Sequence, residues 1–200
     1  MEEKSLNEEK ISDEKKSNSF YLEFYDWIAF VFSAMLCFLL IFTIVARPII
    51  VDGESMLPTL EHKNMLIVSD MVYEPQYEDI VVVYAPRLYN VATNGYGKII
   101  VKRVIGLPGD TIRIDFSKGI VYRNGEALDE PYTNSLTNIQ QNFPNNKEVK
   151  IPENNIFVLG DNRNKSKDSR SYDIGMIDVR CVIGKNMLRV LPVDQFGVVR

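Results

Sequence analysis

The sequence has few of the side chains that bind transition metals. Among 200 residues it has one histidine, His62, and two cysteines, Cys37 and Cys181, with no C-x-x-C spacing. Cys37 lies inside the longest apolar run, so we do not expect a disulfide between the two. Zinc sites need several His, Cys or carboxylate ligands at characteristic spacings. We therefore predict chemistry that uses no metal and no other cofactor.

Positive charge is also scarce. The chain carries 23 Lys and Arg against 27 Asp and Glu, a formal net charge of -4, and no lysine-rich or arginine-rich stretch. Proteins that bind nucleic acid neutralise phosphates with a basic patch. This absence excludes nucleic acid as a partner, and the length suits one globular domain with a further segment attached.

The longest apolar run, residues 27–45, has nineteen residues and no charge. As a helix it would be about 28 Å long, close to the roughly 30 Å hydrocarbon core of a bilayer. A buried helix of a soluble protein would normally keep a polar face. A cleavable signal peptide would be shorter and would end in a small-residue site, unlike Ala46-Arg47-Pro48. We predict one transmembrane helix over residues 27–46, in contact with membrane lipid.

Residues 1–26 are charged and poor in large apolar side chains until Phe20. Such a segment cannot bury a core, so we predict a disordered arm. Flanking charges say little about orientation, because the cations within reach are Lys10, Lys15 and Lys16 before the apolar run and Arg47 and Lys63 after it. The chemistry of the next domain is the stronger guide.

Residues 47–200 are predicted to form a mainly antiparallel β domain. Asn124-Gly125 predicts a two-residue type I′ hairpin turn, since both positions require positive φ angles. The polar stretch 129–155 is expected to be irregular cover, part of a cap-like insertion over about 111–155. Runs of β-type residues occur at 49–51, 65–68, 80–84, 98–105, 111–114, 119–123, 156–160 and from 181 onward.

The segment VDGESMLPTL places Ser55 after an acidic turn at Gly53 and before Met56. A serine in such a loop often hydrogen-bonds to its own backbone, and the residues alone leave this alternative open.

The segment KRVIGLPGD puts two cations, Lys102 and Arg103, inside a β-branched strand whose side chains alternate between faces. Both faces are apolar, so at least one cation is expected in partly dry surroundings unless it extends outward along its own stem. Burial lowers a lysine pKa from about 10.4 toward neutrality, and a neutral lysine is a general base.

The segment GDNRNKSKDSR, residues 160–170, comes after a predicted buried strand and is rich in acid and arginine residues. A solvated loop is one interpretation. Because surface ion pairs contribute little stability, their density here favours a scaffold for a site. The residues concerned are Asp161, Arg163, Asp168 and Arg170, with Ser166 as a hydrogen-bond donor.

These three segments, behind an amino-terminal span, resemble the type I signal peptidase family, the Ser-Lys leader peptidases of bacterial membranes. SMLPTL is similar to the family's nucleophile box, and KRVIGLPGD and GDNRNKSKDSR come after it in the family's order. The resemblance implies that Ser55 is the nucleophile and Lys102 the general base. It implies that Ser166 orients the lysine, with Met56 after the nucleophile and Asp161, Arg163, Asp168 and Arg170 as a supporting framework.

The chain departs from the family pattern at several positions. Some relatives add an oxyanion-binding hydroxyl two residues before the nucleophile, where this chain has Gly53, as in the Gram-positive branch. Losing one oxyanion donor can cost about a hundredfold in rate, so the backbone near Gly53 must compensate or turnover is slower. Lys63-Asn64 and Tyr77-Glu78-Asp79 also differ from common family sequences. His62 has no family counterpart and is expected to be a loop residue without a catalytic role.

The resemblance implies a membrane-bound serine endopeptidase that removes signal peptides from exported preproteins emerging from the secretion translocon. Ten residues separate residue 45 from Ser55, at most about 35 Å of extended chain, so the site would work near the membrane surface. The β domain would lie outside the cell membrane and the arm in the cytoplasm. The alternatives are a self-cleaving repressor with the same dyad, which would lack a span, and a non-catalytic tethered binding domain.

Overall fold

The computed structural model describes residues 21, 23–40, 47–69 and 73–199. The chain divides into two compact units, Met1–Val45 and Ala46–Arg200. In the first unit, the helix Glu23–Leu40 is long and apolar enough to cross a membrane, and none of its side chains is buried. Residues 23–26 are helical, although they fall in the part of the sequence predicted to be a disordered arm. Residues 1–20 of the arm and 41–46 of the predicted span lie outside the described residues.

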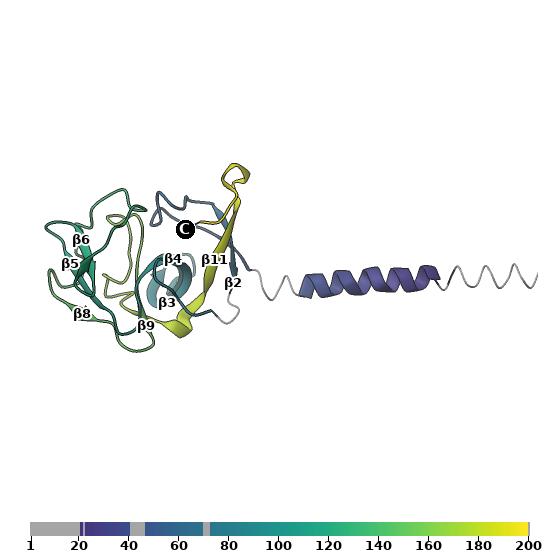
Figure 1. The fold of residues 1–200 in the computed structure, drawn as a ribbon, viewed down its shortest axis with the longest axis horizontal. Helices are drawn as coiled ribbons and strands as arrows, with labels where there is room; N and C mark the ends of the chain where they lie inside the picture. Colours follow the sequence, from purple (N-terminus) through teal and green to yellow (C-terminus); the bar gives the residue numbers. More distant parts are fainter. Residues whose placement is uncertain (1–20, 22, 41–46, 70–72, 200) are drawn as a thin grey trace, which may run out of the picture. The chain divides into compact units, whose positions relative to one another are not determined.

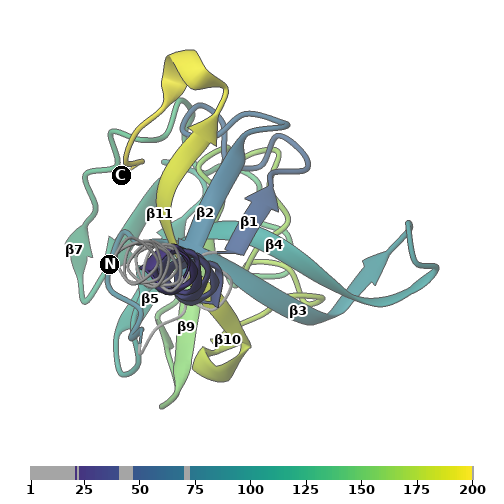
Figure 2. The same cartoon turned by 90° about the vertical axis from the view of Figure 1, so that its right-hand side faces the viewer.

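The second unit is built on a seven-stranded antiparallel sheet, which confirms the mainly β prediction. Each predicted run from 49–51 onward lies in or overlaps a strand. The order across the sheet is β1 (Arg47–Ile50), β2 (Met65–Ser69), β11 (Val182–Leu191), β3 (Ile80–Asn90), β4 (Gly95–Gly106), β9 (Asn155–Leu159) and β10 (Ile177–Asp178). Strands β3 and β4 form a long hairpin that extends beyond the rest of the sheet (Figure 2).

A second, four-stranded sheet lies at one end of this unit (Figure 1). Its turn at Asn124-Gly125 has φ angles of 53° and 86°, and Arg123 pairs with Glu126 across it, so the predicted two-residue hairpin is confirmed. The stretch 129–155 is mainly turns but also supplies one strand of this sheet. In spatial order the strands are β7 (Glu126–Ala127), β6 (Ile120–Arg123), β5 (Thr111–Asp115) and β8 (Val149–Lys150). Two short 3-10 helices, η1 (Val179–Cys181) and η2 (Val193–Gln195), flank β11.

The middle of the large sheet is buried on both faces. Residues 80–83 of β3 and 102–106 of β4 are all buried, so both faces of the hairpin base are covered. Strands covered on both sides read as continuous β-branched runs because neither face meets water. A cation in such a strand has no short route to solvent, and two of the buried residues of β4 are Lys102 and Arg103.

Candidate active site

The segment carrying Ser55 connects β1 to β2 and is anchored by apolar side chains. Met56 is 1% exposed and packs in a core cluster with Val51 and Leu60. The backbone N–H of Leu60 donates to the carbonyl of Met56 at 2.9 Å, which closes a helical turn directly after Ser55. Met56 therefore holds the turn against the core, and Ser55 remains half-buried above it.

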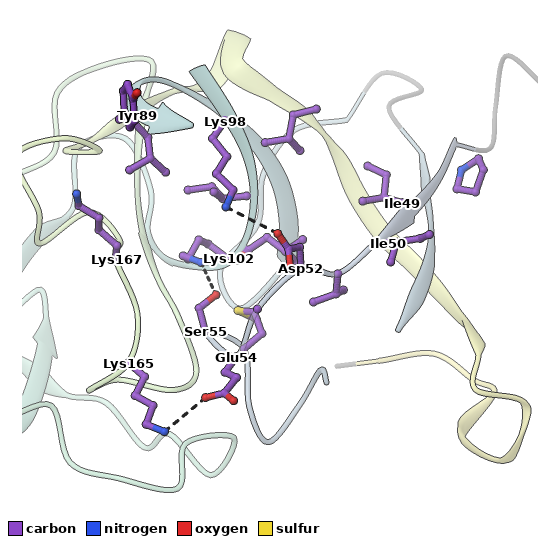
Figure 3. A pocket seen from close by; sticks show the side chains of 18 residues that line it. Ile49, Ile50, Asp52, Glu54, Ser55, Tyr89, Lys98, Lys102, Lys165 and Lys167 are labelled. Atoms are coloured by element: carbon purple, nitrogen blue, oxygen red, sulfur yellow. Dashed lines mark hydrogen bonds and ion pairs between the residues drawn. The ribbon is translucent and has the colours of Figure 1, made fainter. Parts of the chain in front are cut away.

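Lys102 reaches this serine from β4. Its Nζ lies 2.7 Å from Oγ of Ser55 and 2.8 Å from the carbonyl oxygen of Val101 (Figure 3). Burial lowers the pKa of Lys102 to about 8, although the carboxylates of Asp168 and Asp161 act in the opposite direction. A neutral amine is therefore accessible near physiological pH, in contact with a hydroxyl. The outward-extending lysine considered from the sequence is wrong, since Lys102 is 3% exposed.

A cavity of about 670 Å³ opens over the pair. It lies between the edge strand β1 with the segment after it and the β3–β4 hairpin. Isoleucines of β1 and β4 supply apolar lining, including Ile49, Ile99 and Ile100. Lysines 98, 165 and 167 also line the cavity, and the first two pair with Asp52 and Glu54 (Figure 3).

The third segment supports the site through buried ion pairs. Asp161 is fully buried, and its carboxylate accepts from Nε and Nη2 of Arg103 at 2.9 and 2.7 Å. The hydroxyl of Thr59 donates to the same carboxylate at 2.5 Å. Asp161 thereby ties β4 to the segment that carries the nucleophile.

Two further arginines hold the loop after β9. Both terminal guanidinium nitrogens of Arg163 donate to Glu130 in the predicted cap region, at 2.6 and 2.5 Å. Arg170 donates to both oxygens of Asp168 at 2.8 Å, and Asp168 accepts from the N–H of Gly160 at 3.1 Å. The arginines and aspartates thus form separate, buried contacts that fix the loop's backbone.

Ser166 lies beside the nucleophile segment but does not contact Lys102 by a hydrogen bond in the described residues. Its Oγ is buried without a hydrogen-bond partner there. A Cβ placed on Gly160 would lie 2.2 Å from Oγ of Ser166 and 2.4 Å from the carbonyl oxygen of Ser55. Glycine at position 160 is what allows these two segments to approach so closely. The orienting role of Ser166 remains a prediction.

Gly53 lies in the cavity wall, two residues before Ser55, with φ at 109°. Its backbone N–H donates to Nδ1 of His62 at 3.2 Å. That N–H is therefore engaged within the loop and is not free to replace the missing oxyanion donor.

The structure brings together most of the residues singled out from the sequence, with different pairings. The predicted acid and arginine framework is present, but Asp161 pairs with Arg103 and Arg163 with Glu130. No role was predicted from the sequence for Arg103 or Glu130, and no sequence pattern around Glu130 indicates one. Asn162 was also missed, although its N–H donates to the carbonyl of Ser55 at 3.1 Å. Both cysteines are free.

Comparisons with known proteins show which family the chain resembles. Residues 24–191 match the family described as "Signal peptidase, peptidase S26". "Probable signal peptidase I-1" of Synechocystis sp. is 38% identical over 82% of this chain and 81% of the relative. "Signal peptidase I S" of Bacillus subtilis is 34% identical over 85% of this chain and 90% of the relative. A crystal structure of a signal peptidase I from Enterococcus faecalis V583 matches with 31% identity and a TM-score of 0.42, covering 56% of this chain and 97% of that one.

The matching family and both curated relatives are peptidases, so the chain belongs to this class of proteins. The chain belongs to the signal peptidase family, peptidase S26. The resemblance drawn from the three sequence segments is confirmed, and the similar proteins include signal peptidases of Gram-positive bacteria.

Proposed function

We propose that the chain is a membrane-bound serine endopeptidase that removes amino-terminal signal peptides from exported preproteins with a Ser55–Lys102 dyad. The observation that carries the proposal is the buried amine of Lys102, with its pKa lowered to about 8, at 2.7 Å from the hydroxyl of Ser55. Membership of the signal peptidase family supplies the reaction and the substrate class.

The dyad moves one proton in each half of the reaction. The neutral amine of Lys102 accepts the hydroxyl proton of Ser55 as Oγ attacks the scissile carbonyl, and the resulting ammonium gives this proton to the leaving amine. Water then attacks the acyl-enzyme ester, with Lys102 taking a proton from water and returning it to Oγ of Ser55. The backbone N–H of Ser55 donates to the oxyanion in both steps.

The substrate would bind as an added strand. β1 is an edge strand of the large sheet and lines the cavity, so its outer edge can pair with an extended peptide. The apolar side chains of Ile49, Ile99 and Ile100 border the same cavity and favour small apolar side chains over charged ones. Small residues at the first and third positions before the cut fit such a surface.

The apolar helix Glu23–Leu40 supports a tethered enzyme. A preprotein whose apolar segment is held in the same bilayer is presented at raised effective concentration, without additional contacts. We place the catalytic unit outside the membrane, where cleavage sites emerge, and the amino terminus in the cytoplasm.

The test is cleavage of a precursor with an Ala-x-Ala site by the full chain in detergent. We expect Ser55→Ala and Lys102→Ala each to abolish product formation. Ser117→Ala and Lys118→Ala are matched controls, because both side chains are exposed in the β5–β6 turn. Undiminished cleavage by either dyad variant would refute the mechanism. Binding of the precursor without any cleavage by the unmodified chain would favour the non-catalytic alternative.

A further inference from the structure

The nucleophile segment is held by a short ladder whose last step uses a side chain. The N–H of Val51 donates to the carbonyl of Asn64 at 2.9 Å, and the N–H of Lys63 donates to the carbonyl of Val51 at 2.9 Å. The next step would involve Gly53. Its N–H instead donates to Nδ1 of His62 at 3.2 Å, so an imidazole completes the ladder beside the nucleophile turn.

This contact makes Nδ1 of His62 a hydrogen-bond acceptor. A backbone N–H can only donate, so the contact requires an Nδ1 that carries no proton. Oδ1 of Asp52 lies 3.6 Å from the same Nδ1, and Oδ2 of Asp52 lies 4.0 Å from Nζ of Lys98. Among the residues the structure describes, Asp52 is the only carboxylate within ion-pair distance of His62. The other charged groups of the turn, Glu61 and Lys63, are exposed.

A proton on Nδ1 would convert the acceptor into a donor. The bond from Gly53 would then be lost, and the imidazolium would face the carboxylate of Asp52. The last step of the ladder therefore requires Nδ1 of His62 to act as an acceptor.

The position of this step matters because Gly53 lies only two residues before the nucleophile. Gly53 has φ at 109°, and a Cβ there would meet no atom within 4 Å, so no side-chain packing holds its conformation. The N–H of Ser55 is the proposed oxyanion donor. Movement at Gly53 is transmitted through Glu54 to that donor and to Oγ.

We infer that His62 is a positioning residue for the nucleophile turn and that it acts through the acceptor Nδ1. The inference rests on the proposed peptidase function. The imidazole itself touches no reacting atom. His62 is the only histidine in the chain, so its ring signals can be assigned without overlap.

The test compares kcat/KM at about pH 8.5 for the full chain in detergent and for two variants. Oδ1 of asparagine falls where Nδ1 of histidine does, so His62→Asn keeps an acceptor, whereas His62→Ala removes it. His62→Asn should retain activity within about twofold of the unmodified enzyme, while His62→Ala loses about three- to tenfold.

Glu61→Ala is the matched control, because Glu61 is exposed in the same turn. It should reproduce the kcat/KM of the unmodified enzyme. Identical kcat/KM values for the unmodified chain, His62→Asn and His62→Ala would overturn the inference. Equal losses in His62→Asn and His62→Ala would also overturn it, because a retained acceptor should rescue activity.

A spectroscopic measurement separates this inference from the proposed function. Nitrogen-15 NMR of the single imidazole in Ser55→Ala should show the Nε2-protonated tautomer at about pH 8.5, and adding His62→Ala should shift the amide signal of Gly53. If both are seen while His62→Ala leaves cleavage unchanged, the contact exists without a positioning role, which overturns the inference. If Ser55→Ala and Lys102→Ala cleave normally, the proposed function fails, and the role assigned to His62 fails with it.

Discussion

Two neighbouring residues of β4 are buried cations with different partners and different pKa behaviour. Lys102 and Arg103 are 3% and 1% exposed, but their side chains lie on opposite faces of the strand. Arg103 meets the carboxylate of Asp161 in a two-point contact, and its guanidinium also lies 4.0 Å from the ring centre of Tyr132. Lys102 contacts a hydroxyl and a carbonyl oxygen, and burial lowers its pKa to about 8.

The difference shows that burial alone does not decide what a cation does in a protein. A carboxylate in direct contact offsets the desolvation of a charge and leaves a structural link. Neutral partners do not offset it, so burial lowers the pKa of Lys102. One strand thereby carries an ion pair on one face and the proposed general base on the other.

The largest effect is expected when Lys102 is made like its neighbour. Lys102→Arg replaces the amine by a guanidinium that cannot lose its proton, so kcat should fall by about a thousandfold or more. The measurement is single-turnover cleavage of the precursor at about pH 8.5. Lys118→Arg, at an exposed position, is the control and should leave the rate unchanged. A Lys102→Arg enzyme within tenfold of the unmodified one would show that the amine is not the base.

The second change removes the ion pair on the other face. Arg103→Met leaves the carboxylate of Asp161 buried and uncompensated, which should lower the free energy of unfolding by about 3–5 kcal/mol. The measurement is denaturant unfolding in detergent, followed by fluorescence. The double variant Arg103→Met, Asp161→Leu should recover part of this loss, because it leaves no unpaired charge buried at this site. A double variant less stable than Arg103→Met would contradict this explanation.

The acid limb of the pH profile measures the protonation of the buried amine of Lys102. The base form of Lys102 is present above its pKa of about 8 and is lost as pH falls through that value. Between about pH 8 and 6.5, kcat/KM should therefore decrease about tenfold per pH unit. Initial rates with a peptide substrate at low concentration provide the measurement. A profile flat from pH 6 to 9 would mean that Lys102 is not titrating in the catalytic step.

The smallest effect is expected at Thr59, which gives Asp161 its third hydrogen bond. Thr59→Val removes this bond but leaves Arg103 in place, so stability should fall by about 1–2 kcal/mol. Thermal unfolding measures this loss. Thr93→Val, at an exposed position, should have no measurable effect. Equal stabilities of the two variants would show that the contact of Thr59 contributes nothing.

Much of the fold was accessible from local patterns. Strands β3 and β4 were predicted over 80–84 and 98–105 because their bases are rich in β-branched residues. Their extension to Asn90 and from Gly95 was missed, since this part contains proline, glycine and exposed tyrosines. The helix also begins before Trp27, because an isolated helix can include polar residues that a hydropathy argument excludes.

The site was predictable where the chemistry is local and unpredictable where it depends on distant partners. Ser55 and Lys102 were singled out from their own segments and from a family resemblance. The pairing of Arg103 with Asp161 joins residues 58 positions apart, and no pattern in either segment specifies the other. The link between Gly53 and His62 was missed for a different reason, since it depends on a turn geometry that sequence patterns do not describe.

The close approach at Gly160 has a consequence for the timing of activity during synthesis. Ser55, Lys102 and Gly160 come from three well-separated stretches, and the first two are 47 positions apart. The carbonyl of Ser55 is packed against Gly160 and the Ser166 side chain, which are made late in translation. A nascent polypeptide therefore cannot complete the proposed active site until this later segment has been synthesised and folded.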